Sequence, residues 1–233
     1  MLLRMTREPL LKIARDVVAC ELCPRLVRFR RAVAAEPPRR HRGEAYWARP
    51  LPGFGDPAAR LLVVGLAPAA HGGNRTGRIF TGDSSGDFLF AALHRAGFAN
   101  QPVSIAADDG LLLRDCYVTA AARCAPPDNR PTPEEFARCR PYLVRELLAL
   151  PGVRVALALG ALAWESVFRA LAAAGAPAPR TPFAHGAELP AARPGGAPLL
   201  LIGSYHVSRQ NTNTGRLTPA MLDAVLTRAR GAL

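Results

Sequence analysis

The chain has 233 residues, of which 49% are apolar and 21% charged. This composition supplies a core for about one to one and a half ordinary domains, so a disordered chain and a collagen-like repeat are excluded. Thirty Lys and Arg residues against eighteen Asp and Glu residues leave a net charge of +12, which favours a polyanionic partner, nucleic acid first.

A GC-rich coding sequence would also enrich the chain in Arg, Ala, Gly and Pro. Lys12 is the only lysine, and codon bias explains Arg in place of Lys, but it does not explain the surplus of positive over negative charge. No apolar run approaches the roughly eighteen residues of a membrane helix, and the N-terminus lacks the pattern of a signal peptide. We therefore expect a cytoplasmic protein with no membrane partner.

The first twenty residues are predicted to form a helix, because Leu10, Ile13, Val17 and Val18 recur at helical spacing. The chain then turns at a Cys-Pro pair and becomes strongly basic. The basic residues are Arg25, Arg28, Arg30, Arg31, Arg39, Arg40 and Arg42. Pro and Gly residues between Pro37 and Pro57 indicate an extended, loop-rich approach to the core.

From Leu61 onward, short apolar runs alternate with longer helical patterns, which is typical of a mainly parallel sheet covered on both faces. The predicted strands are Leu61–Gly65, Tyr117–Ala121, Val153–Leu159 and Leu199–Ile202. The predicted helices are Gly86–Ala96, Pro133–Leu150, Ala161–Ala174 and Pro219–Arg230. Two segments are interpreted as surface connections, Ala172–Pro179 and Pro190–Pro198. The expected fold is an α/β, three-layer αβα sandwich around a mainly parallel four-stranded sheet.

Ligands of such sheets bind beyond the carboxyl ends of the strands, so chemistry is expected in the loops that follow each strand. The first loop, residues 65–87, is rich in Gly, whose amides can face an anion, and Ser84 or Ser85 is a candidate cap for the next helix. The patterns G-x-x-x-x-G-K-[ST] and G-x-G-x-x-G are absent, which argues against hydrolysis of a nucleoside triphosphate. The loops 120–135 and 204–212 bring further polar side chains to the same edge.

Five cysteines in a reducing compartment argue against a disulfide framework and leave metal binding or core packing. Cys20 and Cys23 form a C-x-x-C motif, and Cys124 and Cys139 stand at either end of a Pro-rich loop. Cys116 lies inside an apparent strand.

Three segments, taken together, resemble the family 5, or type B, uracil-DNA glycosylases. They are R-x-F-T-G-D-x-S-G-D from Arg78, R-C-A-P-P-x-N-R-P-T-P-E-E from Arg123, and S-Y-H-x-S-R-Q-N-T from Ser204. They follow predicted strands in order, four spaced cysteines accompany them, and the resemblance extends from Cys20 to Thr218. It implies a single domain with the uracil-glycosylase fold, spanning residues 1–233, and excision of damaged bases from DNA.

The resemblance also implies a four-iron, four-sulfur (4Fe-4S) cluster. Its ligands would be Cys20, Cys23, Cys124 and Cys139. Four thiolates suit such a cluster, which would tether the N-terminal segment, residues 1–57, to the core. The same sulfurs could instead hold zinc. Cys116 is then left as strand packing.

Base excision requires a nucleotide to leave the duplex and its base to be stacked and read in a pocket. By resemblance Phe80 stacks on the base. The other expected substrate-binding residues are Gly65, Leu66, Ala67, Asn74 and Ala120. The base leaves as an anion while the sugar becomes cationic, so catalysis is chiefly electrostatic. His206 is expected to hydrogen-bond the base oxygen, and Asp83 to orient water or stabilise the sugar, with Asn129 assisting. Two alternatives are a structural His206 satisfied by the backbone and Asp87 in place of Asp83.

Two departures from the wider superfamily bear on specificity. Leu66 and Ala67 stand where other families usually place a polar residue that activates water, and Ala120 stands where they place an Asn that reads uracil. We expect a wider pocket that admits hypoxanthine, xanthine and ethenocytosine as well as uracil.

For DNA binding, the tip after the last strand resembles the loop that wedges into the duplex beside the flipped nucleotide. Val207 is expected to fill the vacated stacking space and Arg209 to meet phosphate or the orphaned base. The expected DNA-binding residues are Val207, Ser208, Arg209, Gln210, Asn211 and Arg78, and Arg75, Arg123, Arg130 and the basic N-terminal run would supply further phosphate contacts.

The leading hypothesis is a monomeric, monofunctional DNA glycosylase. Lys12, the sole lysine, lies in the N-terminal helix, so Schiff-base lyase chemistry is disfavoured. The alternatives are a noncatalytic iron-sulfur protein that binds damaged or abasic DNA, and an iron-sulfur nuclease. The chain shows no cluster of Asp and Glu suited to two metal ions, and Asp108 and Asp109 are interpreted as turn residues.

Overall fold

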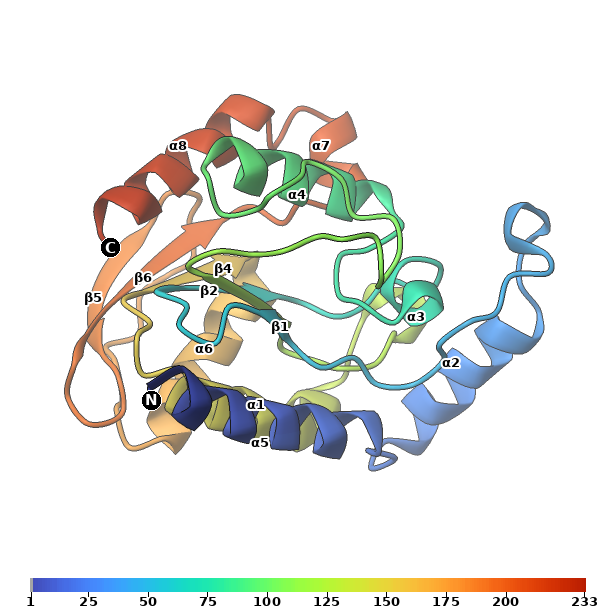
Figure 1. Ribbon diagram of the computed structural model, residues 1–233, viewed down its shortest axis with the longest axis horizontal. Helices are drawn as coiled ribbons and strands as arrows, with labels where there is room; N and C mark the ends of the chain where they lie inside the picture. The colour runs from blue at the N-terminus through green and yellow to red at the C-terminus, as the bar shows by residue number, and fades with distance from the viewer. Residues whose placement is uncertain (1) are drawn as a thin grey trace.

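The fold is built on one six-stranded sheet with the strand order β1-β3-β2-β4-β6-β5. A computed structural model describes the backbone of residues 2–233 and the side chains of residues 7–233. The four central strands are mutually parallel, as predicted. They are β2 (Leu61–Gly65), β3 (Cys116–Ala120), β4 (Val155–Leu159) and β6 (Pro198–Ser204). The αβα class and the parallel centre are therefore confirmed (Figure 1).

The sheet is wider than predicted, because an antiparallel strand is added at each edge. These are β1 (Phe54–Gly55), which pairs with β3, and β5 (Glu188–Ala192), which pairs with β6. The interpretation of 190–198 as a surface connection is thus wrong for its first residues. The segment has no β-branched residue and contains Pro190, which an edge strand tolerates because one side of its ladder needs no donor.

Helices cover both faces of the sheet (Figure 1). One face carries α4 (Ser84–Arg95) and α8 (Pro219–Gly231). The other carries α1 (Leu2–Val18), α5 (Pro133–Ala149) and α6 (Ala161–Ala173). The predicted helices in this set are confirmed to within two residues at each end. The start of α5 is set by Thr132, whose hydroxyl accepts from the Glu135 N–H while Glu135 accepts from the Thr132 N–H.

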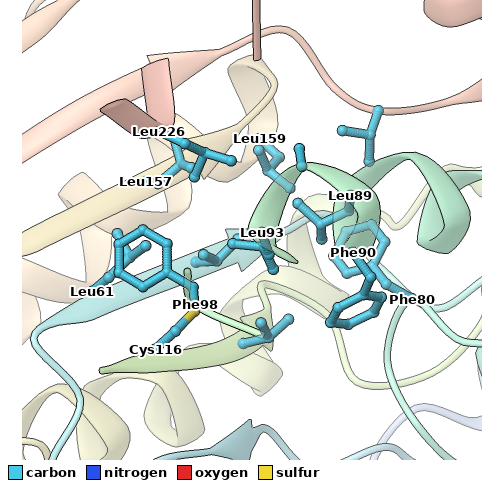
Figure 2. Packing of buried hydrophobic residues seen from close by; sticks show 14 of the residues in the cluster. Leu61, Phe80, Leu89, Phe90, Leu93, Phe98, Cys116, Leu157, Leu159 and Leu226 are labelled. Carbon is cyan, nitrogen blue, oxygen red and sulfur yellow. The ribbon is translucent and has the colours of Figure 1, made fainter. Parts of the chain in front are cut away.

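Alternate side chains of β2 pack into the two core layers, one on each face of the sheet. Leu61 and Val63 face the α4–α8 layer, whereas Leu62 and Val64 face the α1–α5–α6 layer, as the two-residue period of a strand requires. Figure 2 shows the first layer, in which Leu61 and Cys116 lie near Phe98. Cys116 is fully buried there, so its assignment to strand packing is confirmed.

Three further helices, two of them short, lie on the side where the parallel strands end (Figure 1). They are α2 (Pro24–Ala35), α3 (Gly73–Thr76) and α7 (Arg209–Asn213), and single 3-10 turns occur at Arg39–His41 and Pro127–Asn129. The sequence predicted only basic character for the segment that forms α2. The helix was missed because its buried apolar face is small: Leu26 is its only fully buried apolar side chain. None of the described helices has both the length and the apolar character needed to cross a membrane.

Candidate functional site

The first two strand-end loops join through the backbone. The Ala121 N–H donates to the Gly65 carbonyl at 2.9 Å, and the Ala122 N–H donates to the Leu66 carbonyl at 2.9 Å. The ring of Phe80 folds back over the same point. A Cβ atom at position 65 would lie 2.6 Å from the Phe80 ring, so only glycine leaves room for the ring.

The third loop reaches the same place. The rings of Phe80 and His206 lie 6.1 Å apart, centroid to centroid. Behind His206, a Cβ atom at Gly160 would lie 3.2 Å from the Cβ of His206, and the Gly160 N–H donates to the Ser204 carbonyl at 2.7 Å. The loops after β2, β3, β4 and β6 therefore meet at one edge of the sheet, as expected for parallel strands.

Phe80 is held in a strained backbone conformation. Its φ is +53°, a region that a bulky residue rarely adopts. Its carbonyl oxygen lies where a side chain at Gly86 would be, 2.0 Å from that Cβ position. Such strain persists only where the surroundings impose it, and it is frequent at binding sites. Here it directs the ring toward Gly65.

Asp83 caps α4. Its Oδ1 accepts from the N–H groups of Ser85 and Gly86 at 2.9 and 3.0 Å. The suggestion that Ser84 or Ser85 is the cap is therefore wrong, and it is Asp83 rather than Asp87 that binds the helix N-terminus. The reason is local: Asp83 takes the extended cap conformation, and Ser84 is already the first residue of the helix.

The cap leaves half of the carboxyl group free. Oδ2 of Asp83 lies against Gly72, 1.8 Å from where a Cβ would be, and makes no hydrogen bond within residues 7–233. Desolvation raises the pKa of Asp83, although the two cap hydrogen bonds oppose the shift. The same carboxyl group can therefore hold the helix with one oxygen and act on a ligand with the other.

His206 presents an unsatisfied nitrogen. Its Nε2 is buried and has no hydrogen-bond partner among the described residues, so the structure does not support a histidine satisfied by the backbone. Burial lowers its pKa to about 4, and the ring is therefore neutral at neutral pH. A buried polar atom without a partner is costly, and a ligand oxygen would relieve that cost.

The remaining expected base-binding residues differ in exposure. Gly65 and Ala120 are buried, and Leu66 and Ala67 are half-buried. Asn74 is fully buried, and its amide nitrogen lies 3.3 Å from the Arg30 carbonyl and 3.4 Å from the Ala70 carbonyl. These bonds tie α2 to the first loop, and only the Oδ1 atom of Asn74 lacks a partner in the described part of the chain.

Asn129 lies on the exposed end of the second loop. Its φ is +55°, a left-handed conformation that Asn tolerates. Its side chain forms no hydrogen bond to Asp83 or His206 in this structure, in which the side chains of all three residues are described. The structure thus brings the rings of Phe80 and His206 together, places Asp83 in the same loop as Phe80, and leaves the Asn129 side chain exposed on the second loop.

Arg78, expected to bind DNA, is turned into the protein in this structure. Its guanidinium is buried and donates to both carboxylate oxygens of Asp109 at 2.8 Å. It also donates to Thr81, Ser104 and the Ala107 carbonyl. Sequence alone gives no sign of a partner 31 residues away. Asp109 accepts three backbone N–H groups as well, so its interpretation as a turn residue is confirmed.

Val207 is not available as a wedge in this conformation. It is fully buried in the core layer beside α4 and α8. Ser208 is the N-cap residue that precedes α7, and Arg209 and Gln210 are exposed. Asn211 donates to the His206 carbonyl at 2.8 Å and so positions the His206 backbone.

The expected phosphate-binding arginines separate into two groups. Arg123 is buried and pairs with Glu146, Arg75 pairs with Glu44, and Arg25 with Glu135. Arg30 is buried as well. The exposed ones are Arg28, Arg31, Arg39, Arg40, Arg42, Arg130 and Arg209. This second group is the more exposed one, although Arg31 also pairs with Glu21.

A polar cluster that the sequence did not single out supports the first loop. Tyr46 Oη lies 3.0 Å from His71 Nδ1. Arg75, which pairs with Glu44, also donates to the Gly82 carbonyl at 3.0 Å. The cluster thus fixes the turn immediately before Asp83. Nothing in the sequence pattern links residues so far apart.

The four expected ligand cysteines converge on one place. Cys23 and Cys124 share a small buried cluster with Leu26. Burial raises the pKa of Cys124 to about 12 and that of Cys139 to about 11, and repulsion from the neighbouring thiols adds to both shifts. Donors surround the group: Arg138 faces Cys23, the Tyr142 hydroxyl faces Cys20, and the Arg123 N–H faces Cys139.

The packing around the thiols tests what they could hold. Among the described residues, no three His, Cys, Asp or Glu side chains are grouped as ligands of a single metal ion. Four sulfurs with surrounding donors fit a larger anionic group, since hydrogen bonds to sulfur stabilise such clusters. Arg25 and Arg138 also tie the corner between α1 and α2 to α5 and its preceding loop, through Glu135 and the Leu22 carbonyl.

A separate cavity of about 880 Å³ opens at the opposite, amino-terminal edge of the strands. It is lined by Arg60, Arg154 and Arg193 together with apolar residues. None of the residues of the three motif loops lines it, so it is not the pocket for an extruded base.

The chain is similar in sequence to known proteins over most of its length. Residues 52–230 match the model of the uracil DNA glycosylase superfamily. A type-5 uracil-DNA glycosylase of Thermus thermophilus is 55% identical over 214 residues, which are 92% of this chain and 94% of that protein. One of Pyrobaculum aerophilum is 49% identical over 213 residues, 91% of this chain and 88% of that protein. A type-4 uracil-DNA glycosylase of Archaeoglobus fulgidus is 37% identical over 120 residues, 51% of this chain and 52% of that protein.

Proposed function

The chain belongs to the uracil-DNA glycosylase superfamily, and from this premise we propose how it acts. It is a uracil-DNA glycosylase, which hydrolyses the bond between the base and the deoxyribose and leaves an abasic site. The observation that supports the mechanism is the approach of the Phe80 and His206 rings where the parallel strands end, with Asp83 capping α4 in the same loop as Phe80. DNA is the partner. We propose that the protein acts as a monomer and in the cytoplasm.

The chemistry follows from the charges that develop. As the bond breaks, the base becomes an anion and the sugar an oxocarbenium-like cation, so one donor and one anionic group are needed. A base stacked on Phe80 lies beside His206, whose neutral ring donates a hydrogen bond from its Nε2–H to the base oxygen. The free Oδ2 of Asp83 stabilises the sugar cation or orients the attacking water. Asn129, which is exposed on the second loop, is proposed to assist this step.

We propose that the reaction stops at base release. A lyase step requires an amine that attacks the sugar to form a Schiff base. Lys12 is the only lysine of the chain, and it is exposed on α1, where it pairs with Asp16 at 3.3 Å. Its helix packs on α5 in the layer opposite α4, so it does not reach the site.

The substrate range extends beyond uracil. Leu66, Ala67 and Ala120 offer no side-chain amide or hydroxyl to select the hydrogen-bonding edge of uracil. A site without such groups rejects other bases weakly, because no buried polar atom is left unpaired by them. Hypoxanthine, xanthine and ethenocytosine are therefore also released. This proposal fails if uracil is released several orders of magnitude faster than hypoxanthine from the same duplex.

We further propose that Cys20, Cys23, Cys124 and Cys139 hold a 4Fe-4S cluster. The donors around the four thiols support it, since hydrogen bonds to sulfur stabilise such clusters. The zinc alternative uses the same four sulfurs, and metal analysis distinguishes the two. When bound, the cluster would fix α2 and its exposed arginines against the core. It supplies no step of base release, which the site residues perform.

A panel of duplexes with single lesions tests the site. Release of free base is measured for the unaltered protein and for Asp83→Ala, Asn129→Ala and His206→Ala. The assignment is overturned if none of the three slows release more than about tenfold, since a catalytic acid or base contributes about 10²-fold or more. Binding of lesion DNA without base release would instead favour the noncatalytic alternative, and strand scission sensitive to EDTA would favour a nuclease.

A further inference from the structure

Two apolar side chains project into solvent beside the site. Ile105 is 64% exposed and Val103 is 44% exposed, although apolar residues of this size are usually buried. Both belong to the segment 97–115 between α4 and β3. Figure 1 shows this segment extending to the side of the sheet where α3 and α7 lie.

Ile105 lies directly beside the catalytic loop. The Gly82 N–H donates to the Ser104 carbonyl at 2.8 Å. The Ile105 carbonyl would lie 3.3 Å from a Cβ at Gly82, the residue before Asp83. Ile105 therefore follows directly after Ser104, whose carbonyl bonds to the turn that carries Asp83.

The loop is held rigidly rather than loosely. Arg78 and Ser104 are buried, and the guanidinium donates to the Ser104 hydroxyl at 2.9 Å. Asp109 receives the Ile105 N–H at 2.7 Å and pairs with Arg78. Arg78 lies two residues before Phe80, so one network fixes both the stacking ring and the exposed Ile105.

Duplex DNA is the partner that this arrangement fits. Extrusion of a nucleotide leaves a gap in the base stack, and enzymes and architectural proteins fill such gaps with apolar side chains, isoleucine among them. Val207 is buried and cannot fill the gap without leaving the core. Ile105 is exposed, and its backbone lies against Gly82, in the same loop as the Phe80 on which the base is proposed to stack.

We propose that Ile105 is the residue that enters the base stack of duplex DNA beside the extruded nucleotide, with Val103 supporting it at the edge. This rests on the proposed function. Ile105 is a positioning residue: it holds the duplex open and touches neither the reacting bond nor the base in the pocket. Its contribution is therefore confined to paired DNA, because an unpaired strand has no stack to hold apart.

The test compares Ile105→Ala with a matched control. Leu112→Ala removes a side chain of equal exposure, 64%, from the same segment, and the Leu112 N–H bonds to Asn100 rather than to the catalytic loop. Uracil release is measured in single turnovers on a duplex and on the single strand of the same sequence. Melting temperatures check that both variants are folded.

We expect Ile105→Ala to slow release from the duplex at least tenfold and from the single strand less than twofold. Ile105→Leu, which keeps the apolar bulk, should restore most of the duplex rate, and Leu112→Ala should leave both rates unchanged. The proposal is overturned if the duplex rate is unaffected, if both substrates slow equally, or if Leu112→Ala behaves like Ile105→Ala.

A second measurement separates this proposal from the proposed function. A 2-aminopurine next to the lesion brightens when it is unstacked, and this signal needs no base release. If the unaltered protein releases no base yet brightens the probe, and Ile105→Ala does not, the wedge is supported and the glycosylase activity is refuted. If base is released but Ile105→Ala brightens the probe fully, the wedge is refuted and the activity stands. Capture of another protein by Ile105 with no change on duplex DNA would also overturn the wedge.

Discussion

The rings of Phe80 and His206 lie 6.1 Å apart, with their planes inclined by 38°. The two residues come from the loops after β2 and β6, and Gly65 and Gly160 leave the space in which the rings sit. A base stacked on Phe80 therefore meets an imidazole that is already in place, and no rearrangement of the backbone is needed to bring the donor to it.

We expect His206→Ala to slow uracil release by about 10²-fold to 10³-fold, the usual loss for one donor to a developing anion. Because burial lowers the pKa of His206 to about 4, the ring stays neutral and should contribute no change in rate between about pH 5.5 and 8. A pH–rate profile of both proteins checks this. A transition near pH 6.5 that disappears in His206→Ala would contradict a neutral donor.

The same residue should make stability depend on pH. The folded pKa, about 4, lies below the ordinary value of 6.5, so between these values the unfolded chain binds more protons. Stability is fully present above about pH 6.5 and decreases as the pH falls toward 4. Denaturant unfolding at several pH values gives the free energy of unfolding of the unaltered protein and of His206→Gln. Over that window the free energy should change more steeply with pH in the unaltered protein. Parallel curves would contradict burial of the ring.

Two substitutions of Asp83 should separate its two roles. Asn caps a helix about as well as Asp, so Asp83→Asn should slow release more than tenfold with little loss of stability. Asp83→Ala should slow release similarly and also destabilise the protein by about 1 kcal/mol. Burial raises the pKa of Asp83. The rate should therefore fall on acidification at a pH above the ordinary pKa of Asp, and this fall should be absent in Asp83→Asn. Full activity of Asp83→Asn would exclude a catalytic carboxylate.

Arg78 and Arg209 should respond in opposite ways. Arg78→Ala leaves the half-buried Asp109 without its ion-pair partner and should destabilise the fold by about 1–3 kcal/mol. Arg209→Ala should leave stability unchanged and reduce the salt dependence of DNA binding by about one phosphate contact. Thermal unfolding and binding titrations at several salt concentrations measure the two effects. If folded Arg78→Ala lost as much salt dependence of DNA binding as Arg209→Ala, Arg78 would be a DNA contact after all.

Cys124→Ser should lower the iron content and the melting temperature, whereas Cys116→Ser should keep the full iron content. Both thiols are buried, but only Cys124 lies among the other three expected ligands. Iron and inorganic sulfide analyses of the purified variants decide the point. Equal iron in both variants, or zinc in place of iron in the unaltered protein, would count against the cluster.

Much of the fold could be predicted because strands buried on both faces carry a signal within a few residues. Leu61–Gly65 is an uninterrupted apolar run, and its predicted ends match β2. Pro133 and Pro219 begin helices after capping threonines, and their predicted starts are confirmed. β5 carried no such signal: it is a strand only because β6 offers it an edge.

The sequence by itself determined the residue types at the ends of the parallel strands, and with them the family and the chemistry of the site. Only the tertiary structure decided which charges and apolar groups are free to act. Arg78 and Arg209 are the same residue type, yet one is neutralised by Asp109 and the other is exposed. Val207 is buried while Ile105 is exposed. Burial and ion pairing depend on residues distant in the chain, so neither can be deduced from local spacing.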